Sequence, residues 1–131
     1  MLSLKPDDVQ FIGRDLVRPE CVLTTRSGDL FTSDGRGGVS VVRPDGTQEL
    51  ILPDDALDGF LPNGIALMPN RDVLIANLGA AGGVWRLRPD GALSLEIAEA
   101  DGLTLPPINF VGLDGQGRLW ITVSTRVIPR Q

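Results

Sequence analysis

The sequence repeats itself with a period of about 45 residues, and this repetition limits the possible fold more than any other feature. The tetrapeptide Arg-Pro-Asp-Gly at 43–46 recurs at 88–91. A second segment also recurs: Gly-Asp-Leu-Phe-Thr-Ser-Asp at 28–34 has counterparts in Arg-Asp-Val-Leu-Ile-Ala-Asn at 71–77 and Gly-Arg-Leu-Trp-Ile-Thr-Val at 117–123. Repeats of this length indicate that one supersecondary unit occurs several times and buries its apolar face against its neighbours.

Each repeat contains short runs rich in Val, Ile, Leu and Thr, separated by turns that contain Gly, Asp or Pro. No segment carries a sustained apolar period of 3.6 residues with caps at its ends, which argues against helices. We expect strands at 22–25, 29–33, 38–43, 48–52, 64–68, 72–77, 83–88, 93–98, 110–113 and 118–124. Four short strands per unit are typical of a propeller blade. The prediction is an all-β fold, a β-propeller fragment of about two and a half four-stranded blades.

The whole chain, 1–131, is expected to form one partial propeller domain with blade repeats at about 18–60, 61–105 and 106–131. The third repeat contains only two of the expected strands. A propeller fragment leaves strand edges that proteins normally pair or cover. The chain is therefore expected either to assemble with copies of itself or to be truncated from something longer.

The composition excludes several classes of site. The formal net charge is −5, which disfavours nucleic acid as a partner because phosphates attract clusters of Lys and Arg. With no His and a single cysteine, Cys21, the chain has no Ser-His-Asp triad, His-ligated zinc site or intrachain disulfide. A signal-peptide pattern and an apolar run of about 18 residues are also missing, so we expect a cytoplasmic protein without a membrane partner.

Three polar residues share one position within the repeat. Glu20, Asn63 and Asn109 precede the second expected strand of their repeats by the same number of residues, each just before or at the start of a first strand. In a propeller the first strand of each blade lines the central channel. The shared position therefore predicts that the three side chains converge near the propeller axis.

The chemistry of these three residues allows two interpretations. Carboxylate and amide oxygens are the hard ligands that Ca²⁺ prefers, and Ca²⁺ takes six to eight of them in flexible geometry. The other interpretation is a turn, because Pro-Glu and Pro-Asn often precede strands and Asn-Gly is a common turn dipeptide. From spacing alone, both remain open.

Four other conspicuous residues are expected to have structural roles and not to belong to a functional site. Trp85 and Trp120 lie in expected strands and are interpreted as core between blades. Asp34 and Asn77 end the second expected strands of their repeats and are interpreted as turn residues.

The segments at 18–22, 61–66 and 109–120 resemble the SMP-30/gluconolactonase/LRE-like family, which includes regucalcin and bacterial gluconolactonases. The resemblance extends over about residues 9–130 and corresponds to the first half of a family domain. Members are six-bladed propellers, so the resemblance implies half of a six-bladed propeller. One departure is Asn109-Phe110, where the family commonly has Asn-Asp.

The resemblance also implies roles for the three polar residues. Glu20 matches a metal-ligand glutamate of the first blade, and Asn109 matches an asparagine near both metal and substrate. Asn63 matches an asparagine at the rim of the pocket, which implies a contact with substrate. The family's remaining ligands, an Asn and an Asp that is also the usual base, have no counterpart here, so the catalytic residue is unknown.

Two functions follow as expectations. In its complete form the protein is expected to be a divalent-metal (calcium) dependent hydrolase of lactones or related esters. The alternative is a non-catalytic, truncated half-propeller that binds a ligand or assembles with itself. A two-fold homodimer would complete the propeller and bring two copies of Glu20 and two of Asn109 to one axis.

Overall fold

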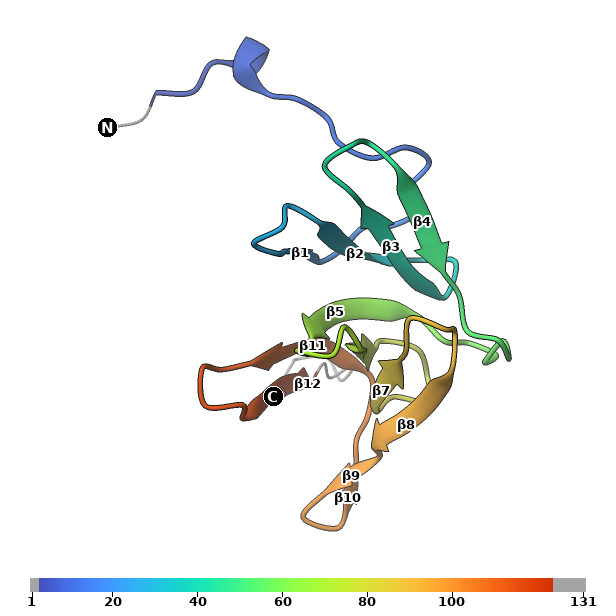
Figure 1. The fold of residues 1–131 in the computed structure, drawn as a ribbon. Coiled ribbons are helices and arrows are strands. Elements are labelled where there is room, and N and C mark those ends of the chain that lie inside the picture. The colour runs from blue at the N-terminus through green and yellow to red at the C-terminus, as the bar shows by residue number, and fades with distance from the viewer. Residues whose placement is uncertain (1–2, 124–131) are drawn as a thin grey trace.

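The computed structural model describes residues 3–123, and these form antiparallel sheets arranged as consecutive propeller blades (Figure 1). The first blade has the strands β1 (Val22–Thr24), β2 (Leu30–Asp34), β3 (Gly38–Val42) and β4 (Gln48–Ile51). The second has β5 (Pro62–Leu67), β6 (Val73–Asn77), β7 (Val84–Leu87) and β8 (Leu93–Ile97). The third contributes β11 (Ile108–Leu113) and β12 (Leu119–Val123). The chain is thus a propeller fragment, as the repeat predicted.

Two small elements complete the described chain. A single 3-10 turn, η1 (Pro6–Asp8), lies in the N-terminal segment, and the short strands β9 (Glu99–Ala100) and β10 (Leu103–Thr104) form a hairpin between the second and third blades. In the part of the chain that the structure describes, no helix has the length and apolar character needed to cross a membrane.

Within each complete blade the strands pair in the order in which they occur in the chain. The first strand therefore lies at one edge of the sheet and the fourth at the other. Figure 1 shows β1, β5 and β11 gathered on one side of the molecule and β4 and β8 on the opposite side. The starts of the three first strands are the places where the sequence predicted a functional site.

The hairpin turns repeat as the sequence does. In the β3–β4 turn, Asp45 Oδ1 accepts hydrogen bonds from Thr47 N at 2.9 Å and from its hydroxyl at 2.7 Å, and Gly46 adopts a positive φ of 83°. Asp90 Oδ1 accepts from Ala92 N in the β7–β8 turn, where Gly91 has φ 93°. This Asp-Gly chemistry is what the repeated tetrapeptide encodes.

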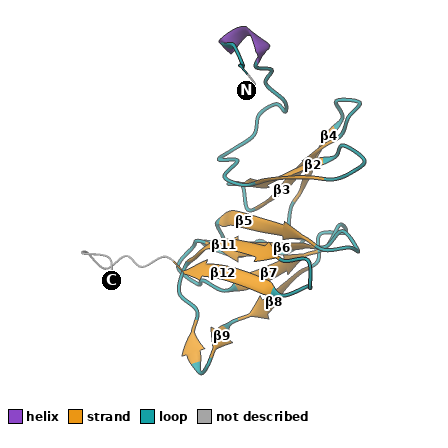
Figure 2. Ribbon diagram, turned by 90° about the vertical axis from the view of Figure 1, so that its left-hand side faces the viewer, coloured by secondary structure: helices purple, strands orange, loops and turns teal. Residues whose placement is uncertain are grey.

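The blades pack face to face, and the second blade is buried on both of its faces. Successive side chains of a strand point to opposite faces. Val73 and Ile75 of β6 join the core against the first blade, while Leu74 and Ala76 join the core against the third. Because neither face meets water, β6 reads as a continuous apolar run instead of an alternation. Figure 2 shows the first sheet lying as a separate layer over the other two.

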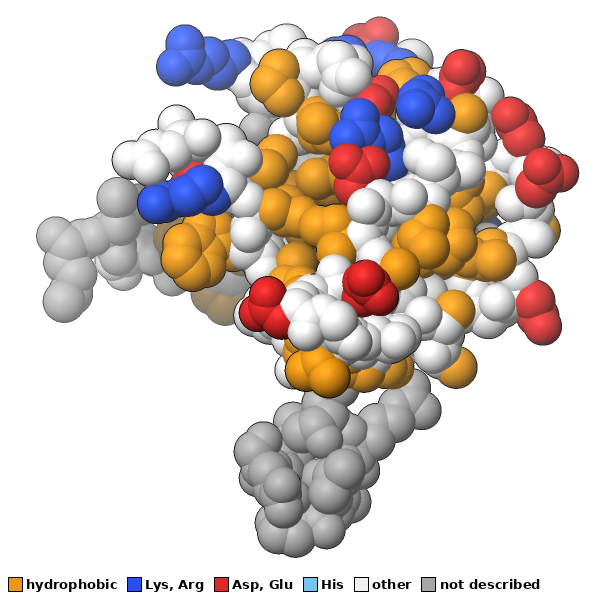
Figure 3. All heavy atoms as spheres, turned by 90° about the horizontal axis from the view of Figure 1, so that it is seen from below, with side chains coloured by type: hydrophobic (Ala, Val, Ile, Leu, Met, Phe, Trp, Pro, Cys, Tyr) orange, Lys and Arg blue, Asp and Glu red, His pale blue; other side chains and the backbone are white. Residues whose placement is uncertain are grey.

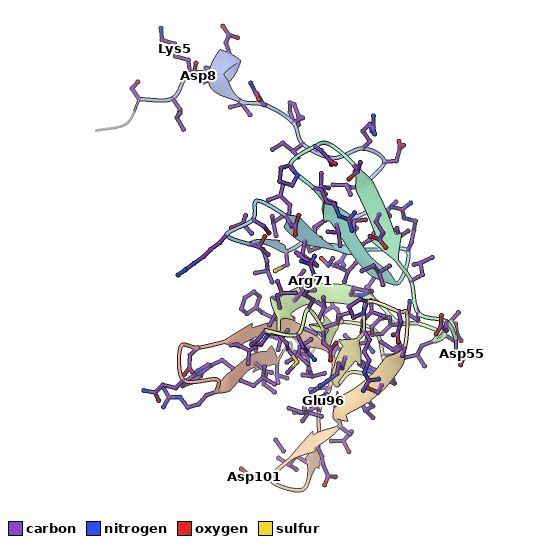
Figure 4. All side chains as sticks on the ribbon, in the orientation of Figure 1. Lys5, Asp8, Asp55, Arg71, Glu96 and Asp101 are labelled. Carbon is purple, nitrogen blue, oxygen red and sulfur yellow. The ribbon has the colours of Figure 1, made fainter. Side chains whose placement is uncertain are left out.

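Polar contacts also join the first two blades at the far end of this interface. Arg71, at the β5–β6 turn, approaches Asp29 Oδ2 to 3.3 Å and lies 5.3 Å from the ring centroid of Phe31 (Figure 4). The guanidinium therefore covers an aromatic ring of the core while it pairs with a carboxylate of the neighbouring blade.

The N-terminal segment runs along the first blade before the repeat begins. Gln48 and Arg14 exchange two hydrogen bonds, from Arg14 N to Gln48 Oε1 at 2.9 Å and from Gln48 Nε2 to Arg14 O at 2.7 Å. Further along, Val17 O accepts from Gly35 N at 2.7 Å. These contacts hold the approach to β1, and with it the position of Glu20.

Asp34 and Asn77 were expected to serve turns, and this is confirmed: both side chains are buried and form hydrogen bonds with the backbone of adjoining loops. The carboxylate of Asp34 accepts hydrogen bonds from Val17 N, from the backbone and side chain of Arg36, and from the Ser40 hydroxyl. Asn77 Oδ1 accepts from two backbone N–H groups, and its Nδ2 donates to Gly82 O at 3.0 Å. Each residue ends the second strand of its blade and satisfies backbone groups that would otherwise be buried without partners.

The two tryptophans differ from one another. Trp85 is confirmed as core, since it packs edge-on against Phe60 with ring centroids 5.8 Å apart and donates from Nε1 to Gly82 O. For Trp120 the expectation is wrong, because its side chain is 63% exposed. It pairs with Gly112 on the face of the third blade that points away from the second, and its indole N–H donates to Asp114.

Most expected strands are confirmed, with ends that differ by one or two residues. The β9–β10 hairpin was missed because its short, exposed strands leave no apolar alternation in the sequence. β5 and β11 begin two residues earlier than expected, since an irregular register near each start hides the alternation. Of the expected strand at 118–124, Ser124 lies outside the described residues.

Asp34 should make the stability of this fold sensitive to acid. Burial raises the pKa of the carboxyl, but the hydrogen bonds from Arg36, Val17 and Ser40 outweigh burial and lower it from 3.8 to about 2. The folded state then binds this proton less readily than the unfolded chain, so the stabilisation is present at neutral pH and is lost as the pH falls from about 4 to about 2.

We expect Asp34→Asn to lower the free energy of unfolding by about 2 kcal/mol at pH 7. The difference between wild type and variant should shrink as the pH approaches 2. Urea titrations at several pH values measure both effects. Asp55→Asn, in the exposed β4–β5 loop (Figure 4), is the matched control and should change little. A difference between wild type and Asp34→Asn that does not depend on pH would contradict this assignment.

Candidate functional site

The structure brings two of the three predicted site residues into direct contact. Asn63 lies in β5 and Asn109 in β11, and Asn63 Nδ2 donates to the backbone O of Asn109 at 2.6 Å and approaches its Oδ1 at 3.2 Å. Asn63 is 7% exposed, whereas Asn109 is exposed. A buried amide that contacts an exposed one indicates a site in which the second side chain faces a ligand or solvent.

Both asparagines sit at irregular points of their strands. The register of β5 against β6 shifts between Pro62 and Ile65, and that of β11 against β12 shifts between Ile108 and Phe110. Bulges of this kind turn a side chain away from the regular alternation and are frequent beside functional sites. The local irregularity therefore explains how Asn63 can reach across to β11.

Glu20 is joined to the asparagines through Arg18. Arg18 Nη2 donates to Asn63 Oδ1 at 2.9 Å, and its Nη1 donates to Pro62 O at 3.3 Å. Its Nε lies 3.4 Å from Glu20 Oε1, and the two side chains are 33% and 46% exposed. The structure thus brings Asn63 and Asn109 together directly and joins Glu20 to them only through Arg18, in a polar network that links β5 and β11 with the segment leading into β1.

Arg18 is the functional candidate that sequence reasoning missed. It precedes the Pro19-Glu20 pair, and its charge beside a candidate ligand was the available signal. Its backbone has φ 48°, which a non-glycine residue seldom adopts and which is disfavoured before proline. That conformation turns the side chain toward the second blade, and no sequence pattern reports it.

A glycine permits the close approach of β5 and β11. A Cβ atom at Gly64 would stand 2.6 Å from Phe110 Cα and 3.0 Å from Asn109 O, so any side chain there would push the two strands apart. Gly64 directly follows Asn63, and the Asn-Gly pair that resembles a turn signal lies inside a strand. Its role is to let the two asparagines meet.

A groove of about 530 Å³ runs along the same three strands. Leu23 and Thr24 line it from β1, Ile65 and Leu67 from β5, and Phe110 and Leu113 from β11. Within the described part of the chain, no charged residue lines this groove. The polar network therefore lies beside a mostly apolar wall. This arrangement suits a ligand with a polar end and a less polar body.

The network offers hard oxygens for a divalent cation but not a complete shell. Glu20 provides a carboxylate and Asn109 a carboxamide oxygen, which is suitable chemistry for Ca²⁺. Between residues 3 and 123 there is no group of three or more His, Cys, Asp or Glu that could hold a metal ion. The two oxygens fit as part of a shell, and the guanidinium of Arg18 is a competing cation beside them.

Comparisons with solved structures support a propeller of this type. A gluconolactonase from Xanthomonas campestris is 26% identical, with a TM-score of 0.60 over 74% of this chain and 31% of its own. A virginiamycin B lyase from Staphylococcus aureus is 12% identical, with a TM-score of 0.61 over 80% and 34%. Another structure assigned as a gluconolactonase is 21% identical, with a TM-score of 0.57 over 86% and 44%.

The two matches below 25% identity show the fold alone. The chain spans between about a third and just under half of the length of these three neighbours. No protein-family model matches the chain, and no curated protein matches it either. The comparisons therefore establish a gluconolactonase-like propeller fold at low sequence identity.

Gly64→Ala should separate the two asparagines and destabilise the fold. We expect the free energy of unfolding to fall by about 2 kcal/mol, because the added methyl meets backbone atoms that cannot move aside freely. Gly115→Ala is the control, since a Cβ there meets nothing within 4 Å. Thermal and urea unfolding of both variants measure the difference, and equal stabilities would contradict the close approach of β5 to β11.

Proposed function

We propose that this chain forms the first half of a propeller that hydrolyses lactones or related esters with the help of a divalent cation, with Ca²⁺ as the first candidate. The observation that carries the proposal is the contact of Asn63 with Asn109 at the starts of the inner strands, with Glu20 joined to it through Arg18. The 26% identical gluconolactonase supports the same reaction class.

In this proposal Glu20 and Asn109 contribute oxygens to the metal shell. A bound divalent cation polarises a carbonyl and lowers the pKa of a bound water. Asn63 holds Asn109 in place through its Nδ2 and contributes to the contact with substrate. The apolar wall of the groove, including Phe110, would receive the body of the lactone or ester.

A partner must complete such a site, and we propose a second copy of the chain. On the face of the third blade that points away from the second, the Trp120 side chain is 63% exposed. Hydrophobic side chains also gather in the middle of the face seen in Figure 3, with charged side chains around them. A two-fold dimer would cover exposed blade faces and bring two copies of Glu20 and Asn109 to one axis.

A non-catalytic module that assembles with itself is the second candidate. The ion pair of Arg18 with Glu20 favours it, because a carboxylate already paired with a guanidinium binds metal less readily. The same exposed blade face would then serve assembly alone. Hydrolysis distinguishes the two candidates, since both predict self-association and only the first predicts turnover.

Hydrolysis of glucono-δ-lactone by the intact chain, followed in a pH-stat with CaCl₂ and then with EDTA, tests the proposal. We expect calcium-dependent turnover that Glu20→Gln lowers by at least about 100-fold, because even partners outside a metal shell are worth 10–100-fold. Glu49→Gln is the matched control, since Glu49 on β4 pairs with Arg43, the residue that follows β3. Turnover indifferent to EDTA and to Glu20→Gln would overturn the calcium proposal, and no turnover would favour the module.

A further inference from the structure

Arg18 occupies the centre of an oxygen cluster. Its Nη2 donates to Asn63 Oδ1 at 2.9 Å, its Nη1 donates to Pro62 O at 3.3 Å, and its Nε lies 3.4 Å from Glu20 Oε1. A carboxylate, a carboxamide and a backbone carbonyl oxygen are the three kinds of protein oxygen that calcium sites use. In this structure a guanidinium lies among all three.

The backbone of Arg18 is strained to reach this position. Its φ of 48° lies in the left-handed region, and the following residue, Pro19, disfavours helical conformations at the preceding position. Such conformations cost on the order of 1–3 kcal/mol and persist where surrounding contacts hold them. Here the side-chain contacts across to the second blade hold the conformation, which indicates a role for the guanidinium at the site itself.

We infer that Arg18 is the resident cation of this site and sets its affinity for a divalent ion. The inference rests on the proposed function, since it concerns the same metal site. The Arg18 guanidinium lies beside the carboxylate that would hold a divalent ion, so its positive charge would oppose binding and it would have to move away from Glu20. Because the Arg18 side chain is 33% exposed, it can turn toward solvent when an ion enters.

Arg18 is therefore a regulating residue of the metal site. With the guanidinium in place, its positive charge lies beside the Glu20 carboxylate, and Asn63 is held with its Nδ2 toward Asn109. The network is then complete without a metal, and calcium binds only at concentrations that displace Arg18. Removal of the charge should open the carboxylate to calcium while leaving the Asn63–Asn109 contact in place.

Isothermal titration of the intact chain with CaCl₂ tests this inference. We expect Arg18→Gln to bind calcium on the order of tenfold more tightly than wild type, because one like charge is removed within a few ångströms of the ion. Arg18→Lys retains the charge and should stay close to wild type. The further variant Glu20→Gln, made in the Arg18→Gln background, should remove the gain.

Arg43→Gln is the matched control, because it makes the same change in net charge at another ion pair, where Arg43 Nη2, just after β3, lies 2.6 Å from Glu49 Oε2 on β4. Its calcium affinity should equal that of wild type. If Arg18→Gln does not fold by circular dichroism, Arg18→Met removes the charge while keeping the apolar stem, and the same tenfold gain is expected.

The outcomes separate the two proposals. If wild type and the charge-removing variant bind calcium equally, Arg18 does not compete with the ion and the inference is overturned, while the metal site stands. If neither binds calcium, the proposed metal site fails and the inference fails with it. If Arg43→Gln raises the calcium affinity as much as Arg18→Gln does, the change in net charge alone explains the effect, and the role of Arg18 is overturned as well.

Discussion

The packing of blade against blade is the constraint on which the rest of this structure depends. The strand β6 contributes Ile75 to one core and Ala76 to the other, and both side chains are fully buried. A large apolar side chain such as Ile75, when fully buried, stabilises the fold by roughly 1.5–3 kcal/mol. Blades that stack face to face must present their first strands side by side, so the core determines where the site forms.

The site forms where β5 and β11 depart from regular strand geometry. Regular strands would alternate their side chains between the two blade faces, and Asn63 and Asn109 would then point into neighbouring cores. The register shifts in β5 and β11, with Gly64 between the strands, bring the two amides together instead. Arg18, in an unusual backbone conformation, extends the network to the first blade.

The fold was largely predictable because its signals are local and repeated. Asp-Gly turns, apolar runs and the 45-residue period report strands and their pairing directly. The convergence of Glu20, Asn63 and Asn109 followed from their common position in the repeat. What could not be predicted depends on local backbone geometry: the bulges, the positive φ of Arg18 and its contacts across the blade interface. The exposure of Trp120 was also missed, since the apolar pattern of a strand does not show which face of the sheet packs against another blade.

The proposed function requires a partner, and the outward face of the third blade is where we expect one to bind. Trp120 lies exposed on that face, and the polar network at the inner strands supplies only part of a metal shell. A second copy of the chain would satisfy both needs at once. The most direct measurement is the native mass, by light scattering after size exclusion, with and without calcium. We expect the mass of two chains, which associate more tightly when calcium is present. The mass of a single chain in both conditions would contradict the proposed dimer.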